Sequence, residues 1–536
     1  PIIVGDPPGC NVQRRLRCDP RWMYTATYSI LRGNTEPPSY PCVSHTMSNS
    51  HRRPMTSVDA AWLGMDRPTN LMVINSLLFF DVPIAFERLR SVLDTRLVRR
   101  FDRFRQRVVA AGAPGTGSYA WEDDPHFNLH YHLRRVALPA PGGDAALQAL
   151  AGELMSDPLD RNRPLWRFYL IENVDGGCAV LGRIHHCIAD GIALLQVLLS
   201  LTDSEPDAEP VPLTDEHRPK TRRARLFDLP LRLAARVAGQ GLRAADALLN
   251  ANLDLRAGAD ALLQKLESAG LLTATSAAIV AKLLILSPDR PSPYRGQMGG
   301  IKRVTWSNPL PLAEVKAISR ATGTTINDVL VAALAGALRR DLQARGADAG
   351  MGDLRAMVPI NLRRPTDKLG LGNEFSLLYL ALPVSLDGPA ARLAAVQQRM
   401  QLLKNSPEPF LVYQILGIVG MLPGELAHQA VNWFADKASC VLTNVPGPRQ
   451  TLYFAGAAIR RLLFWVPHSG DISMGLSIFS YAGSVTLGLD VDEALVPDPE
   501  RIIEHFYAEM AELQRLAAVY RQAPPSAAYV DAGQAL

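Results

Sequence analysis

The chain has 536 residues, which exceeds the usual size of a domain with a single hydrophobic core. We therefore expect two domains or three. Apolar residues make up 48% and charged residues 20%, the balance of a globular protein. The net charge of +4 is too small for a dedicated nucleic-acid binder, so we expect no nucleic-acid partner.

Neither a zinc site nor a disulfide framework is predicted, because the six cysteines include no C-x-x-C pair. A reducing cytoplasm is therefore the expected compartment. Residues 1–30 lack the apolar core of a secretory signal. No run reaches the ~18 uncharged apolar residues that a membrane-spanning helix needs, so we expect contact with a membrane but no crossing.

The first patterned sequence appears near Thr56. Residues 1–54 show no periodicity, and we expect them to be unstructured or a wrongly assigned extension. Ser57 is predicted to cap a helix over 58–63, and a strand follows over 71–80. Apolar residues at helical spacing then predict a long basic helix over 83–111.

The rest of a first domain, over 55–205, combines helices with a hairpin. A helix is predicted over 145–154, and strands over 168–172 and 178–184 are joined by an Asp-Gly-Gly turn. The segment 192–201 is apolar nearly all round, which predicts a buried helix.

A basic, largely helical connector is predicted over 206–295, because a polar, proline-bearing stretch precedes helical segments rich in Ala, Leu and Arg. Its positive charge suits an anionic ligand or an anionic membrane, and a solvated helix face explains it equally well. Against the single acid Asp228 stand Arg218, Lys220, Arg222, Arg223, Arg225, Arg232, Arg236 and Arg243.

A second domain is predicted over 296–520, followed by a tail over 521–536. It opens with a strand over 301–306 and a helix over 311–322 that ends at Gly323. Thr325 and Asp328 have the spacing of a capping box for the next helix, which runs to about residue 345.

Alternating apolar residues later predict a hairpin of strands over 474–481 and 484–492. Asp498 and Pro499 are predicted to begin a final helix that ends near Tyr520. Helices thus alternate with strands in both halves. This favours two mixed α/β (α+β) domains, each with one sheet flanked by helices.

The sharpest local feature is His185-His186-Cys187-Ile188-Ala189-Asp190-Gly191, between a strand and a buried helix. Histidine, with an unperturbed pKa of ~6.5, can take and return a proton near neutral pH. Adjacent side chains on a strand point to opposite faces, so only one histidine can face a cleft and the other must be packed. Asp190 can cap the helix or pair with an arginine, and Gly191 allows a close turn.

Two other interpretations of this motif remain open from the residues alone. His186 and Asp190 are four residues apart and could bind a metal, but only on a helix, whereas Asp-Gly is typical of a helix start. We therefore predict no metal site. The two histidines could also be ordinary core residues.

Several blocks in order carry a resemblance to the bacterial wax ester synthase/diacylglycerol acyltransferase family, within the chloramphenicol-acetyltransferase-like acyltransferases that share HHxxxDG. Together they span about 55–520, which disfavours the core-histidine interpretation. The blocks are Thr56–Met65, the HLRRVALPAPG run, Pro164-Leu165-Trp166, the HHCIADG motif, Asn327-Asp328, MVPINLR, TNVPGP and Val496–Pro499. Residues 1–54 have no counterpart, and Tyr294-Arg295-Gly296 stands where many members carry Asn-Gly.

The resemblance implies two similar domains with the reaction at their interface. His186 would be the general base, and His185, Asp190 and Gly191 would hold the loop. Asn327 would orient substrate or donate to an oxyanion, with helix capping as the alternative. Pro164, Leu165 and Trp166 would line the acyl path or fill the core.

The implied reaction transfers an acyl group from acyl-CoA to diacylglycerol or a long-chain alcohol, without a cofactor. Because no G-x-S-x-G nucleophile motif occurs, we expect the transfer to be direct, without a covalent acyl-enzyme. The place implied is the cytoplasmic face of a membrane or a lipid-droplet surface. Two rival functions are a condensation-type transferase that uses a carrier-bound acyl group and a non-catalytic lipid-binding relative.

Overall fold

The computed structural model describes residues 52–111, 118–206, 283, 286–347, 352–363, 370–404, 406, 408–420 and 424–522. The predictions for residues 1–51, for the basic stretch at 218–243 and for the tail beyond 522 lie outside these residues.

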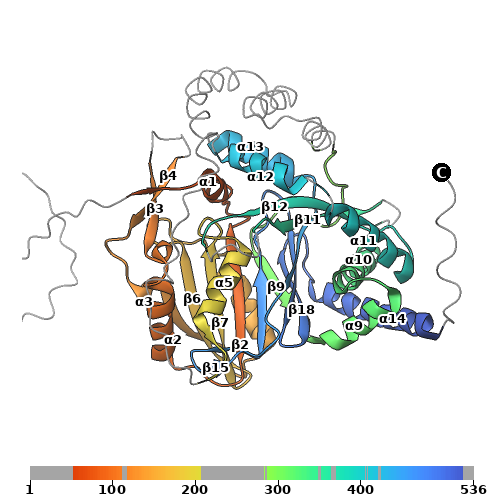
Figure 1. Cartoon of the computed structure of the whole chain (residues 1–536), viewed down its shortest axis with the longest axis horizontal. Coiled ribbons are helices and arrows are strands. Elements are labelled where there is room, and N and C mark those ends of the chain that lie inside the picture. The colour runs from red at the N-terminus through yellow and green to blue at the C-terminus, as the bar shows by residue number, and fades with distance from the viewer. Residues whose placement is uncertain are drawn as a thin grey trace, which may run out of the picture. The chain divides into compact units, whose positions relative to one another are not determined.

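Two mixed sheets form the framework of the described residues (Figure 1). The first sheet has the order β16-β2-β7-β6-β5, with β5 parallel to β6 and the other neighbours antiparallel. Its strands are β2 (Val73–Phe80), β5 (Leu133–Ala137), β6 (Trp166–Val174), β7 (Gly177–His185) and β16 (Arg461–Trp465).

The second sheet has seven strands in the order β10-β18-β17-β13-β11-β12, with β9 also paired to β18. β13 runs parallel to both β11 and β17. The strands are β9 (Lys302–Trp306), β10 (Leu310–Pro311), β11 (Leu354–Asn361), β12 (Phe375–Leu382), β13 (Cys440–Pro446), β17 (Met474–Tyr481) and β18 (Ser484–Asp492).

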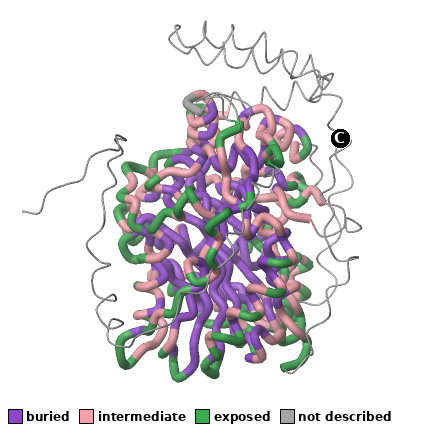
Figure 2. The backbone as a smooth tube through the Cα atoms, turned by 90° about the vertical axis from the view of Figure 1, so that its left-hand side faces the viewer, coloured by how far each residue is buried: buried purple, intermediate pink, exposed green. Residues whose placement is uncertain are grey.

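The helices cover the sheets and bury their apolar faces, so that most residues of the sheet strands are buried (Figure 2). On the first half lie α1 (Ser57–Gly64), α2 (Phe86–Val92), α3 (Leu129–His132), α4 (Asp144–Ser156) and α5 (Gly191–Leu201). On the second half lie α9 (Leu312–Thr322), α10 (Ile326–Ala344), α11 (Pro389–Lys404), α12 (Glu408–Val419), α13 (Gly424–Ala435) and α14 (Glu500–Gln522).

One core belongs to the second half alone, whereas the core of the first half also takes in second-half residues such as Phe375 and Ile415. In the second half α10 packs against α9, α11 and α14, and its apolar residues meet the β17–β18 hairpin. The predicted hairpin is confirmed, as are the capping box of Thr325 and Asp328 and the end of α9 at Gly323, whose φ is 66°. In the first half α5 is buried on the sheet as predicted, with Asp190 as its N-cap.

The predicted long helix over 83–111 is wrong. α2 passes into a π-helical turn over Leu93–Val98 and a 3₁₀ turn over Asp102–Phe104. The chain then continues as β3 (Gln106–Ala110), which pairs with β4 (Tyr119–Asp123). Strand pairing of the β-branched residues at 108 and 109 overrides the helical spacing that precedes them.

Two boundaries also differ from the predictions. Thr56, not Ser57, caps α1, because its Oγ1 accepts a hydrogen bond from Asp59 N. The segment 53–54, placed in the extension, forms β1 (Arg53–Pro54) on β4.

Strands also cross between the two predicted domains. β16, from the second domain, is an edge strand of the first sheet and pairs with β2 over residues 461–465. A small sheet joins β8 (Thr202–Asp203) to β14 (Tyr453–Phe454), which also pairs with β15 (Ala457–Ala458). The two halves are therefore tied together by backbone pairing, which the linear boundary at 205 did not foresee.

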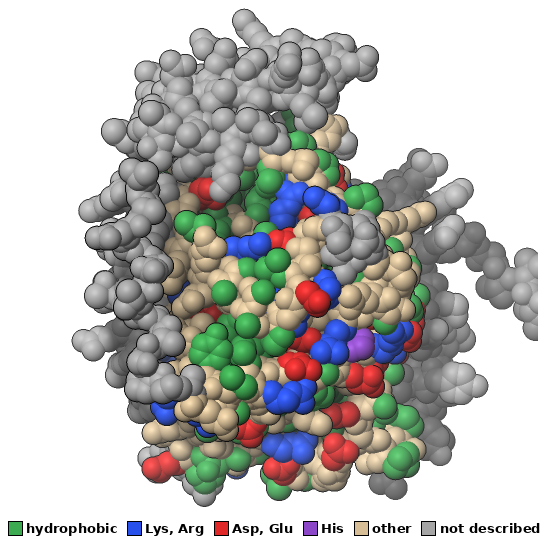
Figure 3. Space-filling view, turned by 90° about the vertical axis from the view of Figure 1, so that its right-hand side faces the viewer, with side chains coloured by type: hydrophobic (Ala, Val, Ile, Leu, Met, Phe, Trp, Pro, Cys, Tyr) green, Lys and Arg blue, Asp and Glu red, His purple; other side chains and the backbone are tan. Residues whose placement is uncertain are grey.

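The face that carries α9 and α14 presents basic and acidic side chains side by side rather than one sign of charge (Figure 3). Ion pairs there include Arg340 with Glu512 and Arg515 with Glu512. Exposed pairs of this kind contribute little stability, and a mixed surface is typical of a solvated face.

Among the described residues, no single helix has the length and apolar composition to cross a membrane. The pair α9 and α10 meets that test together, but the two helices are bent by 98° at their junction.

A tight contact between α12 and α1 yields a stability prediction. A Cβ at Gly420 would lie 1.7 Å from Ser57 O, whereas one at Gly417 would lie 3.8 Å from the nearest atom, on Val58. We expect Gly420→Ala to lower the free energy of unfolding by ~1–3 kcal/mol, the usual cost of overpacking, in urea denaturation. Gly417→Ala, inside the helix, should be neutral or stabilising. Equal effects of the two variants would contradict this close approach.

Candidate active site

The motif loop begins where β7 ends, between two neighbouring segments that hold its backbone. His185 N donates to Leu165 O at 2.9 Å, and His186 N donates to Met72 O at 2.7 Å. β7 lies between β2 and β6, so this end of the strand cannot fray without breaking both sides of the sheet. The two histidines therefore have a rigid backbone.

His185 is the packed member of the pair. Its Nδ1 accepts a hydrogen bond from Cys187 N at 3.1 Å, and its Nε2 lies 3.8 Å from Asp66 Oδ2. Burial alone would raise the pKa of Asp66, but His185, Met72 N and Arg161 hold it at about 2. His185 is 1% exposed and is thus built into the loop support.

The ring of His186 lies between two aromatic rings from different halves of the molecule. It stacks on Trp62 of α1 with centroids 4.2 Å apart, and Phe375 of β12 lies at 5.2 Å. His186 is only 4% exposed, so the expectation of a ring open to a cleft is not met in this structure. Apolar rings that pack around an imidazole exclude water from it.

This burial keeps His186 neutral. Desolvation lowers its pKa from 6.5 to about 4, and the nearby Asp190 carboxylate only partly opposes the shift. A buried imidazole without full compensation for its charge binds a proton less readily. At neutral pH the ring therefore carries a free lone pair, as a proton acceptor requires.

Asp190 joins the two halves of the molecule. Its Oδ1 accepts from Ala193 N at 2.9 Å as the N-cap of α5. Its Oδ2 accepts from Glu374 N at 2.9 Å and from the guanidinium of Arg363. Because donors occupy both oxygens, a metal ion shared by His186 and Asp190 has no support in this geometry.

The residue after this aspartate has no special backbone conformation. Gly191 begins α5 without a positive φ, and a Cβ there would meet only Val466 Cγ1 at 3.9 Å. The backbone and the space at this position therefore do not by themselves require glycine.

Asn373, which the sequence analysis did not single out, lies against the motif loop. Its Nδ2 donates to His186 O and to Asp59 Oδ1, each at 2.8 Å. Burial raises the pKa of Asp59, while the hydrogen bond from Asn373 opposes that shift. Together with Asp190 N, which donates to Gly372 O, these bonds fix the loop of the second half on the motif.

The Pro164-Leu165-Trp166 block packs beneath the motif rather than along an open path. Trp166 is 1% exposed, its indole N–H donates to Phe104 O at 2.8 Å, and it stacks on His132. Leu165 O receives the His185 N hydrogen bond. The block therefore supports the end of β7 through its backbone and the core through its side chains.

Asn327 lies in the first turn of α10 and accepts a hydrogen bond from Asn444 Nδ2 at 2.7 Å. Asn444 belongs to the TNVPGP block on β13. The structure thus joins two of the sequence blocks through the Asn327–Asn444 hydrogen bond. Neither asparagine is hydrogen-bonded to the His186 ring. Asp328 completes the predicted capping box of α10 with Thr325.

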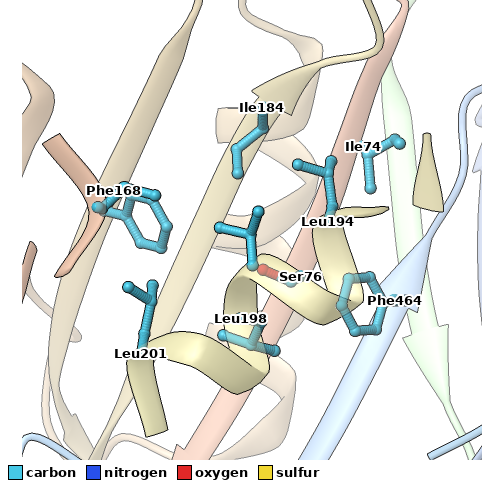
Figure 4. Close-up of a pocket in the computed structure, with 10 residues that line it drawn as sticks. Ile74, Ser76, Phe168, Ile184, Leu194, Leu198, Leu201 and Phe464 are labelled. Atoms are coloured by element: carbon cyan, nitrogen blue, oxygen red, sulfur yellow. The ribbon is translucent and has the colours of Figure 1, made fainter. Parts of the chain in front are cut away.

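A first apolar cavity lies between α5 and the first sheet (Figure 4). Ile184 of β7 lines it, together with Leu194 and Leu198 of α5. It encloses about 350 Å³, and Ser76 is its polar lining residue.

A second apolar cavity of about 600 Å³ lies between α12, α13 and the β11–β12 face. Met65, three residues after Trp62, and Leu377, two residues after Phe375, line it. The buried hydroxyl of Ser376 in this lining has no hydrogen-bond partner. The lining therefore combines Met65 of the first half with residues of the second half.

Sequence reasoning found the histidine but missed the residues that enclose it: Asp59, Trp62, Arg363, Asn373 and Phe375. Three of these lie in the blocks TSVDAAWLGM and MVPINLR, which were recognised only as blocks. A lone acid inside an apolar helix, such as Asp59, is a signal that could have been used. No local pattern marks Asn373.

Comparison with protein families gives two matches. The model described as the wax ester synthase/diacylglycerol acyltransferase catalytic domain matches residues 55–330, and the WS/DGAT C-terminal domain matches residues 371–514.

Among curated proteins, a probable diacylglycerol O-acyltransferase of Mycobacterium tuberculosis, tgs1, is 29% identical over 486 residues, covering 87% of this chain and 98% of that protein. A putative diacylglycerol O-acyltransferase of the same species is 30% identical over 483 residues, covering 86% and 99%.

Among solved structures, the wax ester synthase/diacylglycerol acyltransferase from Marinobacter aquaeolei VT8 aligns with a TM-score of 0.61 at 21% identity, covering 87% of this chain and 100% of that one. The first condensation domain of the CDA synthetase aligns with a TM-score of 0.53 at 16% identity, covering 88% and 97%. These likenesses confirm the predicted two-domain fold.

Proposed function

Because the chain belongs to the wax ester synthase/diacylglycerol acyltransferase family and is an O-acyltransferase that makes neutral lipid esters, we propose that His186 is its general base. The acyl donor is acyl-CoA, and the acceptor is diacylglycerol or a long-chain alcohol. Transfer is direct, and no further cofactor takes part. The observation that carries the proposal is the neutral, buried His186 ring, stacked on Trp62 where β7 ends.

The chemistry follows from what a neutral imidazole can do. As the acceptor oxygen attacks the thioester carbonyl carbon, its O–H proton passes to the ring nitrogen. The C–S bond then breaks, and the imidazolium returns that proton to the departing CoA thiolate. One histidine thus serves both proton transfers, a contribution of roughly 10²–10⁴ in rate.

The two cavities suit the hydrocarbon parts of the two substrates. Apolar side chains dominate both linings, as they do in sites that bind apolar ligands. Since Trp62 and Phe375 now cover the His186 ring, one of the two side chains must turn aside to admit the reacting groups.

Two rival functions make different demands on the site. A condensation-type transferase would use a carrier-bound acyl group, and the likeness to a condensation domain at 16% identity supports only a shared fold. A non-catalytic lipid binder would have no need for a neutral histidine fixed by two strands. The family match therefore favours the lipid esterification.

We also propose that the protein works at the surface of a membrane or lipid droplet. Its substrates partition into lipid, and two large apolar side chains are exposed where α11 ends and α12 begins. Leu402 is 68% exposed and Phe410 is 59% exposed. Apolar side chains next to a lipid-binding cavity are suited to insertion at an interface.

The catalytic role predicts that His186→Ala loses ester formation from long-chain acyl-CoA by at least ~10²-fold, the scale of general base catalysis. Purified protein would be assayed with hexadecanol and with diacylglycerol as acceptors. His132→Ala is the matched control, because His132 is also buried and stacked on a tryptophan but belongs to the core under Trp166. Retained activity in His186→Ala, with an active wild type, would contradict the proposal.

The low pKa of His186 sets the pH profile. Its folded-state value of about 4 lies below the ordinary 6.5, so the neutral base persists as the pH falls below 6.5. We expect kcat/KM to stay level from pH 7 to about 5 and to fall only as the pH approaches 4. Unfolding would be followed in parallel, because the unfolded state binds this proton already near 6.5 and stability declines below that pH. An acid limb at 6.5 in folded enzyme would contradict the burial argument.

Surface association predicts that replacing Leu402 and Phe410 together by serine weakens binding to phosphatidylcholine vesicles containing diacylglycerol by at least ~10-fold, since each buried side chain contributes ~1.5–3 kcal/mol. Vesicle flotation measures the bound fraction. Val82→Ser, at a residue that is 53% exposed, is the control and should bind like wild type. Unchanged flotation of the double variant would exclude this surface.

A further inference from the structure

Three arginine side chains gather around Tyr131, which lies in α3 just before β5. The guanidinium carbons of Arg163 and Arg167 each lie 4.4 Å from the centre of its ring, and that of Arg134 lies 5.8 Å from it. An aromatic ring attracts a guanidinium group and holds it in place, but it supplies no counter-charge. The Tyr131 ring therefore fixes three positive charges close together.

The strand register adds a fourth arginine to this cluster. Arg167 of β6 pairs directly with Arg183 of β7, and Arg134 of β5 pairs with Tyr169, two residues after Arg167. Because side chains alternate along a strand, Arg134, Arg167 and Arg183 share one face of the first sheet. Arg183 also donates to Asp157 O at the end of α4. Like charges directly opposite each other destabilise a sheet, so this arrangement calls for a negative partner.

Protein groups supply little of that negative charge. Asp160 Oδ2 lies 3.6 Å from Arg163 Nε. In the part of the chain that the structure describes, neither Arg134 nor Arg167 has a carboxylate within ion-pair distance. The Nε atoms of Arg167 and Arg183 are buried and lack a hydrogen-bond partner there. Unpaired donors of charged groups are costly, and a bound anion would offset their charge.

The cluster is open to solvent on one side. Arg134 is exposed, while Tyr131, Arg163 and Arg167 are partly exposed. A planar guanidinium group presents several N–H donors in a fork that matches the oxygen atoms of a phosphate group. Several such forks around one point suit a ligand with one or more phosphate groups.

The same cluster lies next to the motif loop. Leu165, whose carbonyl oxygen accepts from His185 N at 2.9 Å, is two residues after Arg163 and two residues before Arg167. β5 and β6 begin at the sheet edge where β7 ends in the motif, because β5 is parallel to β6 and β6 is antiparallel to β7. A ligand held by its anionic end on the arginines can therefore extend toward His186.

We propose that Arg134, Arg163 and Arg167 bind the phosphate groups of the acyl-CoA donor. Acyl-CoA carries its phosphates at the end of the molecule remote from the thioester, as an anion site beside the motif loop requires. This inference rests on the proposed function and adds a donor-binding site on the β5–β6 side of the first sheet. None of the three arginines touches the reacting atoms, so their role is binding.

Removing two of the charges tests the site by kinetics. The double variant Arg134→Gln with Arg167→Gln should raise KM for palmitoyl-CoA by ~10-fold or more, the scale of lost charge-assisted hydrogen bonds. Its kcat should stay within about threefold of the wild type, and KM for hexadecanol should not change. Added salt should narrow the difference between the two proteins, since ions screen exposed charges.

A donor without phosphate separates recognition of phosphate from damage to the fold. Palmitoyl-pantetheine contains the same thioester as palmitoyl-CoA but no phosphate group. With this donor the wild type and the double variant should have the same kcat/KM. A loss of equal size with both donors would overturn the proposal, because it would show that the arginines act on the structure.

Arg135→Gln is the matched control for Arg134→Gln. Arg135 is the next residue of β5, points to the opposite face, and pairs with Glu172 at 2.7 Å with its side chain 60% exposed. Each variant removes one positive charge from the same strand. We expect KM for palmitoyl-CoA to rise about threefold in Arg134→Gln and to stay unchanged in Arg135→Gln. This pair decides the matter if the double variant does not fold, and equal KM values would count against the site.

Direct binding distinguishes failure of this inference from failure of the proposed function. Calorimetric titration of the full-length protein with CoA should show ~10-fold weaker binding in the double variant. Unchanged CoA affinity would overturn the phosphate site. Activity that survives in His186→Ala would instead overturn the general base and leave the CoA result untouched.

Lipid headgroups are the other source of phosphate. Flotation with phosphatidylcholine vesicles that contain phosphatidylglycerol measures this binding without CoA, and we expect the wild type and the double variant to float alike. If the double variant lost vesicle binding but kept its KM for palmitoyl-CoA, the arginines would be a headgroup site and the proposal would be wrong.

Discussion

The buried ion pair between Asp190 and Arg363 is the constraint on which the site depends. Each partner alone would be an expensive buried charge, so the pair persists only while the motif loop stays against Arg363. The same aspartate caps α5 and accepts from Glu374 N. Because this one carboxylate ties a helix of the first half to a strand of the second, the position of Phe375 over His186 follows from it.

Burial of the His186 ring both keeps it neutral and weakens it as a base. Removing water from the ring lowers its pKa to about 4, which keeps it unprotonated at neutral pH but makes it a weak base in the resting enclosure. The rings of Trp62 and Phe375 account for much of this burial. A site that joins a thioester to a lipid alcohol benefits from such an enclosure, since water would compete with the alcohol for the acyl group.

Several polar side chains of this enclosure bind backbone atoms of the motif loop and its neighbours. His185 binds its own loop, Asp66 receives Met72 N, and Asn373 Nδ2 reaches His186 O. Such a network fixes the loop through its main chain and leaves the His186 ring stacked between Trp62 and Phe375.

The sequence alone determined the elements whose signals are local. The β17–β18 hairpin, the capping box of α10 and the buried helix after Asp190 were predicted because alternation, capping spacing and an apolar face act within a few residues. The ordered blocks likewise identified the family and the motif histidine. Only the tertiary structure decided what encloses that histidine, and it also broke the predicted helix over 83–111 and moved β16 into the first sheet. Contacts such as those of Trp62, Asn373 and Phe375 with residue 186 depend on how two sheets pack, and pairing across more than a hundred residues leaves no period in a single chain.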